Sequence, residues 1–211
     1  MQTKIVNLFL RDGNYHFARW SRPISPVVFG VDDETLIAIK EAFFDVISLT
    51  SVGASDVDPD FGANLLVFFC SKWSELNVVP NLSKLIPNLK TLLETLYESD
   101  ANQYRTFSFN KDGAINVVVV LLRYDLELSS VSVQTLAVSQ MVQSILLWSP
   151  SAFKNESPIA LIKETNRCIV KPFYASLIKA AYDPVLPPYS SDETHAIRLK
   201  ARVNLLVEAK P

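Results

Sequence analysis

The chain has 211 residues, of which 49% are hydrophobic and 20% are charged, and its formal net charge is −2. This balance excludes an intrinsically disordered chain and is typical of a folded soluble protein that buries a sizeable core. Lys and Arg residues are scattered and form no basic run, so nucleic acid is not expected as the main partner. The chain shows no internal repeat, low-complexity tract or interdomain linker, and we expect a single domain over residues 1–211.

The N-terminal third predicts a hairpin, an edge strand and a helix. Residues 5–10 suggest a strand by an imperfect alternation, and Asp12-Gly13-Asn14 predicts the hairpin turn that follows it. A strand from Ile24 to Gly30 contains Pro26, which cannot donate a ladder hydrogen bond, so this strand either lies at a sheet edge or starts beyond the proline. Asp32 or Asp33 then caps a helix that runs to about Leu49. No signal peptide is recognisable, and the compartment stays open.

An acidic loop follows, with Asp56, Asp58 and Asp60 at alternate positions. Such spacing resembles the start of a calcium loop, which needs glycine directly after the third acid and a glutamate at its end. Here Phe61 follows Asp60, and Val67 occupies the closing position. We therefore interpret the segment as an ordinary acidic surface loop.

Two continuous apolar runs, Asn64–Cys70 and Ile115–Leu122, predict central strands that are buried on both faces. Between them, the spacing predicts a helical region over Leu82–Tyr97, whose main helix has Pro87 near its first position. Asn110-Lys111-Asp112-Gly113 predicts a turn before the second strand.

The segment Val131–Trp148 predicts the helix around which the chain is built, inside a run from Leu128 to Phe153 that contains no charged residue. It is apolar on most of its circumference, which is typical of a buried helix. Thr135, Ser139 and Gln143 stand at i, i+4 and i+8 and form one polar stripe. Either these groups bond to backbone or water, or they face a cleft. A membrane span is not expected, because serine and glutamine recur throughout.

The C-terminal part predicts two helices. The first covers Lys171–Tyr182 and is stopped by Asp183-Pro184, and Ser190 or Ser191 caps the second. The apolar stripe expected to bury the last helix consists of Ile197, Ala201, Leu205 and Leu206.

Cysteine and histidine are scarce. Cys70 and Cys168 are the only cysteines, too far apart for a zinc framework, and whether they form a disulfide is left open by the sequence. His16 and His195 are the only histidines.

Three short motifs occur in order along almost the whole chain: Arg19-Trp20 followed by Pro23, the strand Asn64–Phe69, and Tyr182-Asp183-Pro184. In this order they resemble a bacterial zincin-like domain family of unknown function, whose members are often predicted to be exported metalloproteases. The resemblance implies an α+β, zincin-like single domain. It also implies a central buried helix packed against a mixed sheet, a mostly helical C-terminal part, and an exported or periplasmic location.

The chain departs from that family on its central helix. Ser139-Gln140-Met141-Val142-Gln143 stands where the family has Glu-Glu-Leu-Thr-Gln, and Ser149-Pro150 replaces a later Asn-Asp. A zincin holds zinc with two histidines at i and i+4 and activates water with a glutamate. Ser139 and Gln143 take the ligand positions and Gln140 takes that of the base, and hydroxyl and amide groups are poor replacements for both. We therefore expect no metal and no cofactor, and a degenerate-site cleft formed by Thr135, Ser139, Gln140 and Gln143.

Three functions remain open. The first is a catalytically silent zincin-like domain that binds a protein or peptide, for which the strand Ile24–Phe29 offers an edge. The second is an active hydrolase of another kind, with Ser139 or a Cys–His pair as nucleophile, although a Gly-x-Ser-x-Gly elbow and a phosphate loop are missing. The third is a structural subunit of an oligomer.

Overall fold

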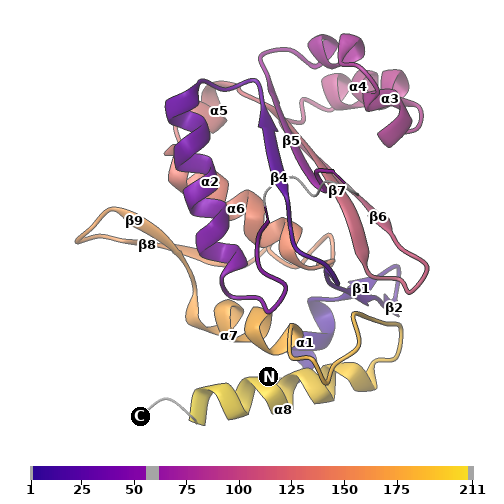
Figure 1. Ribbon diagram of the computed structural model, residues 1–211, viewed down its shortest axis with the longest axis vertical. Coiled ribbons are helices and arrows are strands. Elements are labelled where there is room, and N and C mark those ends of the chain that lie inside the picture. Colours follow the sequence, from indigo (N-terminus) through magenta and orange to yellow (C-terminus); the bar gives the residue numbers. More distant parts are fainter. Residues whose placement is uncertain (1, 56–61, 209–211) are drawn as a thin grey trace.

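The computed structural model describes residues 2–55 and 62–208, so the acidic loop with Asp56, Asp58 and Asp60 lies outside the described residues. It confirms the predicted α+β fold (Figure 1). The helices are α1 (Gln2–Asn7), α2 (Asp33–Ile47), η1 (Trp73–Val78), α3 (Leu82–Leu85), α4 (Leu89–Glu98), α5 (Leu126–Ser129), α6 (Val133–Ile145), α7 (Pro172–Ala181) and α8 (Thr194–Glu208). The strands are β1 (Leu10–Arg11), β2 (Asn14–Tyr15), β3 (Phe17–Ala18), β4 (Pro26–Phe29), β5 (Leu65–Cys70), β6 (Gln103–Phe109), β7 (Ile115–Arg123), β8 (Ile159–Ile162), β9 (Arg167–Val170) and β10 (Tyr189–Ser190).

A four-stranded mixed sheet in the order β4-β5-β7-β6 organises the molecule. β4, β5 and β7 run parallel, and β6 is antiparallel to β7. Of the two alternatives that the sequence left for the strand containing Pro26, the position at an edge is confirmed, and β6 forms the other edge. The Asn64 side chain ties β4 to β5, because its Oδ1 accepts from Ser25 N at 2.7 Å and its Nδ2 donates to Pro23 O at 2.8 Å.

Helices cover both faces of this sheet. α2 and α6 lie on one face, with the larger apolar cluster, while η1, α3 and α4 lie on the other with a smaller cluster (Figure 1). The expected central buried helix against a mixed sheet is thus present as α6, with Met141 and Val142 fully buried. No helix in the described part of the chain combines the length and apolar character that crossing a membrane requires.

α6 is shorter than the sequence predicts. It starts after Ser132, whose Oγ accepts from Thr135 N at 3.2 Å, and ends at Ile145 rather than at Trp148. The chain becomes extended at Leu146, which bridges to Arg19, and Leu147 N donates to Ala18 O at 2.9 Å. A pairing with a distant segment therefore ends the helix, and no local breaker does.

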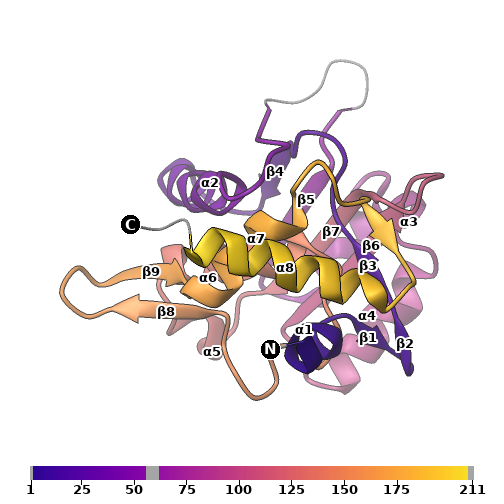
Figure 2. The same cartoon turned by 90° about the horizontal axis from the view of Figure 1, so that it is seen from below.

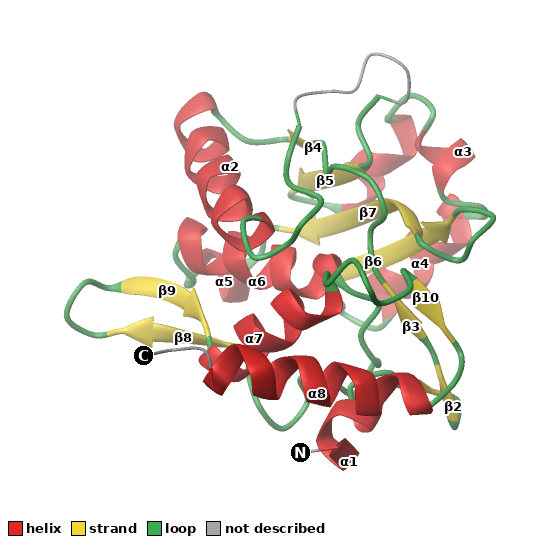
Figure 3. Cartoon of the chain, turned by 60° about the horizontal axis from the view of Figure 1, so that its bottom comes forward, coloured by secondary structure: helices red, strands yellow, loops and turns green. Residues whose placement is uncertain are grey.

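The predicted N-terminal strand is wrong, whereas the hairpin turn after it is right. Residues 2–7 form α1, whose Ile5 and Val6 side chains are buried, and this helix packs beside α8 (Figure 3). β1 and β2 pair around Asp12 and Gly13, which both have positive φ angles.

Two hairpin elements were not predicted from the sequence. β6 pairs with β7 across the turn Asn110–Gly113, and β8 pairs with β9 in a hairpin that projects from the body (Figure 2). Cys168 lies in β9 and is buried. Pro87 is not at the first position of the helix, where the sequence predicts it. Asn88, with a φ of 56°, is the N-cap of α4, so Pro87 lies two residues before the helix begins.

The last helix buries a different face from the one predicted. The stripe Ile197, Ala201, Leu205 and Leu206 is exposed, and His195, Ala196, Leu199 and Val203 pack inward instead. α8 contacts α7 and α1, and the face with His195, Ala196, Leu199 and Val203 is the one that packs against the body of the molecule (Figure 3). Its N-terminal residues are capped by Asp192, whose carboxylate accepts from Thr194 N at 2.8 Å, and not by a serine.

Candidate functional site

Three polar side chains of α6 converge on Arg105, which β6 presents from the sheet. Arg105 Nη1 donates to Gln143 Oε1 at 3.1 Å, Nε donates to Ser144 Oγ at 3.0 Å, and Nη2 donates to Gln140 Oε1. Gln140 Nε2 in turn donates to Gln103 Oε1 at 2.7 Å. Both Gln103 and Arg105 of β6 are therefore hydrogen-bonded to α6.

The structure brings together three of the four residues predicted for the cleft. Ser139 Oγ accepts from Gln143 Nε2 at 3.1 Å, and Gln143 and Gln140 share Arg105. Thr135 lies apart from them, in the first turn of α6, where Ser132 Oγ donates to its hydroxyl at 2.9 Å. Thr135 therefore belongs to the N-terminal cap of α6 and not to the group of side chains around Arg105.

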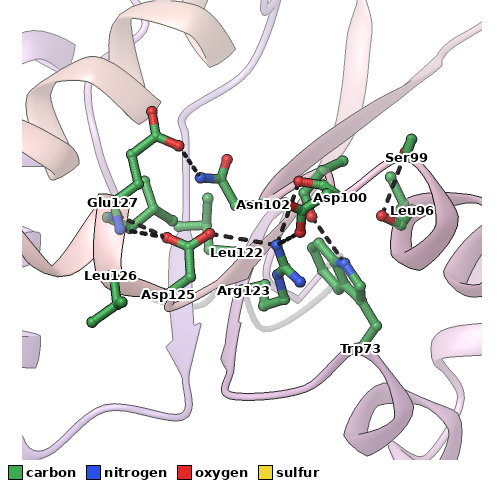
Figure 4. A network of polar contacts seen from close by, with 12 residues as sticks. Trp73, Leu96, Ser99, Asp100, Asn102, Leu122, Arg123, Asp125, Leu126 and Glu127 are labelled. Atoms are coloured by element: carbon green, nitrogen blue, oxygen red, sulfur yellow. Dashed lines mark hydrogen bonds and ion pairs between the residues drawn. The ribbon is translucent and has the colours of Figure 1, made fainter.

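Arg105 has no carboxylate partner among the described residues, which is unusual for a desolvated guanidinium. Burial lowers the pKa of Arg105 to about 10. Arg123, at the end of β7, shows the ordinary arrangement: it pairs with Asp100 at 2.7 Å and with Asp125 at 3.5 Å (Figure 4). The charge of Arg105 is instead spread over neutral amide and hydroxyl oxygens.

This arrangement bears on metal binding. The amide oxygens of Gln140 and Gln143 are the only ligand atoms that these two side chains could offer a metal, and both accept from a guanidinium that carries a positive charge. Within the described ranges, no three His, Cys, Asp or Glu side chains gather as ligands.

His195 and Cys70 are buried in the core. Tyr15 Oη lies 3.0 Å from His195 Nδ1, and the Phe17 ring lies 4.3 Å from the His195 ring. Burial raises the pKa of the Cys70 thiol to about 11, so it is protonated at neutral pH, and its Sγ donates to Leu122 O at 3.6 Å. Neither arrangement activates a nucleophile.

Two cavities flank the Arg105 cluster. The first, of about 360 Å³, we call the β6 pocket; it is lined by Arg11, Arg105, Phe107, Gln143, Trp148, Ser149, Pro150, Phe153 and Lys154. The second, of about 420 Å³, lies at the carboxyl ends of β4, β5 and β7 and reaches Gln140. In the second cavity, the carboxylates of Asp32 and Glu75 already accept from nearby backbone N–H groups, as helix caps.

Sequence reasoning missed Arg105, although a signal was present. Gln103, Arg105 and Phe107 alternate with Tyr104 and Thr106, and this is the period of a strand with two different faces. The three odd-numbered side chains face α6, while Tyr104 packs against the opposite cluster.

Comparison with protein-family models, with curated proteins and with solved structures found no match for this chain.

Proposed function

We propose that this chain is a catalytically silent, zincin-like domain that binds an extended peptide along the open edge of β6. The observation that carries the proposal is the position of Arg105. It belongs to an edge strand and at the same time occupies the polar face of the central helix, where a zincin would hold its metal.

The expected lack of catalytic activity follows from the chemistry of the side chains on α6. Ser139, Gln140 and Gln143 stand at the ligand and base positions suggested by the family resemblance, and none of them is a carboxylate or imidazole. A guanidinium hydrogen-bonded to the two amide oxygens opposes a second positive charge at the same place. The same polar cluster is well suited to recognition, because its groups are held in defined positions.

The β6 edge has the length that strand addition needs, and its outward backbone groups have no hydrogen-bond partner within the described ranges. Arg123 N donates to Asn102 O at 2.8 Å, and hydrogen-bonded pairs alternate along an antiparallel ladder. By this alternation, Tyr104 and Thr106 bond to β7, and the N–H groups of Arg105 and Phe107 face away from it.

β4, the edge predicted from the sequence as the peptide site, is less suited. It has four residues against seven in β6, and Pro26 has no N–H group. The backbone of Ile24, just before it, is already bonded to Gly53 and Ser55.

Backbone hydrogen exchange, measured residue by residue, tests the proposal. We use two capped heptapeptides of alternating threonine and valine, one with glutamate and one with glutamine at the centre, at millimolar concentration. We expect the amides of Arg105 and Phe107 to gain protection, while Tyr104 and Thr106 are protected already without peptide. No protection with either peptide contradicts peptide binding.

Two further measurements separate the alternatives. Mass spectrometry of the peptides after incubation with the protein and zinc should show no cleavage, and hydrolysis would overturn the catalytic part of the proposal. Light scattering at the same protein concentration detects a dimer that pairs two β6 edges. If the protein is a dimer without peptide and the amides of Arg105 and Phe107 are already protected, the partner of the β6 edge is a second copy of this chain and not a peptide.

A further inference from the structure

The β6 pocket carries an excess of positive charge. Arg11 from β1, Arg105 from β6 and Lys154 from the segment after α6 line it, and no acidic side chain is among its lining residues. In the described part of the chain, none of the three has a carboxylate within ion-pair distance. Cations that share a cavity repel each other, so this arrangement favours an anion between them.

Arg11 is only partly satisfied by the protein. Its Nη2 donates to Trp148 O at 2.7 Å, but its buried Nε has no hydrogen-bond partner among the residues that the structure describes. Burial lowers the pKa of Arg11, and the charge of the neighbouring Asp12 opposes this change only in part. The guanidinium therefore keeps unused donors in a desolvated position.

Arg105 has unused donors as well. A guanidinium carries five N–H groups, and the contacts with Gln140, Gln143 and Ser144 engage one on each nitrogen. One N–H remains on each terminal nitrogen. The arginine is also held rigidly, so a ligand would not have to order it first.

Three aromatic side chains form part of the remaining wall. Phe107 and Phe153 line the cavity with Trp148, whose ring stacks on Phe9 at 5.4 Å and meets Phe153 edge-on at 5.2 Å. Lys154 is exposed, so it adds charge without being buried. Apolar walls exclude water and strengthen a charge-assisted hydrogen bond at the centre.

We propose that Arg11, Arg105 and Lys154 form a recognition pocket for an acidic side chain of the peptide bound along β6. This inference rests on the proposed function. In a strand added to β6, the residue opposite Arg105 places its side chain on the same sheet face as Arg105, about 5 Å away. A carboxylate there meets the free donors of both arginines.

Calorimetric titration with the glutamate and glutamine heptapeptides tests this pocket. We expect the glutamate peptide to bind about ten- to a hundredfold more tightly, because charge-assisted hydrogen bonds are at stake. The Arg11→Gln variant should lose most of that preference and Lys154→Gln part of it. Lys163→Gln removes an exposed lysine in the turn between β8 and β9 and serves as the matched control, with no change expected.

The outcomes are distinct. Equal affinity of the two peptides, with protection of Arg105 and Phe107 in both, overturns the acidic preference and leaves peptide binding standing. If neither peptide binds, but inorganic phosphate or acetate binds and Lys154→Gln weakens that binding, the peptide proposal is overturned and the pocket is one for free anions. Because Lys154 is exposed, its variant reports on binding even if Arg11→Gln fails to fold.

Discussion

Gly30 occupies a position in which a side chain has no room. Its φ angle is 84°, and a Cβ atom placed there would lie 2.2 Å from the carbonyl oxygen of Phe69. The residue turns the chain from β4 into α2, directly above the neighbouring strand. Both the backbone angle and the contact require glycine.

The Gly30→Ala variant should therefore lose more stability than a comparable change elsewhere. We expect a loss of at least about 3 kcal/mol in the free energy of unfolding, measured in urea. Gly13→Ala is the control, because Gly13 has a φ of 78° but no atom within 4 Å of its added Cβ, and about 1–2 kcal/mol is expected there. Equal losses of stability in Gly30→Ala and Gly13→Ala would show that the chain after β4 can move away from Phe69 without a cost in free energy.

His195 makes stability depend on pH. Burial, reinforced by Arg198 and Arg19 and opposed by Asp192, lowers the pKa of His195 from 6.5 to about 4. The unfolded chain therefore binds the proton more readily, so this contribution is complete above pH 6.5 and is lost as the pH falls towards 4.

From pH 7 to pH 4, His195 should account for a loss of up to about 3 kcal/mol in the free energy of unfolding. Replacing it by glutamine should flatten this part of the curve, as measured by urea unfolding at a series of pH values. A variant with the same slope as the original protein contradicts the assignment.

At the scale of elements, the contact between β6 and α6 depends on Arg105. Arg105→Leu leaves Gln140 Oε1 buried without its donor, and we expect a loss of about 2–3 kcal/mol. Adding Gln140→Leu removes the stranded acceptor, so the double variant should be less destabilised than the sum of the two single variants. Additive losses in a double-mutant cycle of urea unfolding would mean that the two side chains do not act together.

The central helix α6 and the C-terminal helix α8 should differ sharply in their response to side-chain truncation. Met141 of α6 is fully buried, so Met141→Ala leaves a cavity and should cost about 2–5 kcal/mol. Ile197 of α8 is 50% exposed, and Ile197→Ala should change stability by no more than about 0.5 kcal/mol. A large effect at Ile197 would show that the exposed face of α8 is covered in solution.

At the scale of the whole molecule, the sheet separates the two thiols. Cys70 belongs to the cluster beneath η1, α3 and α4, and Cys168 to the larger cluster around α6. They are free and buried in the structure, which answers the question that the sequence left open.

We expect both thiols to react with a disulfide reagent only after denaturation, and reductant to leave the melting temperature unchanged. Rapid modification of the native protein would show that one side of the sheet opens readily. A mass lower by two hydrogen atoms in the non-reduced protein would instead indicate a disulfide.

The predictions that succeeded come from local patterns. The apolar run of β5, the capped and periodic α2 and the turn at Asp12-Gly13 each specify their conformation within a few residues. The failures concern segments whose partners are distant. Residues 2–7 become a helix because they pack beside α8, and the inward face of α8 is chosen by α7 and α1.

The sequence by itself determined the central strands, the buried uncharged helix and the absence of acids and imidazoles from its polar positions, because side-chain type and spacing are local properties. Only the tertiary structure decided that Arg105 meets Gln140 and Gln143, that β6 is an edge strand of the sheet, and that Arg11 and Lys154 share its pocket. These residues lie on β1, on β6, on α6 and in the segment after α6, and no spacing along the chain encodes contacts that only the packing of sheet against helix creates.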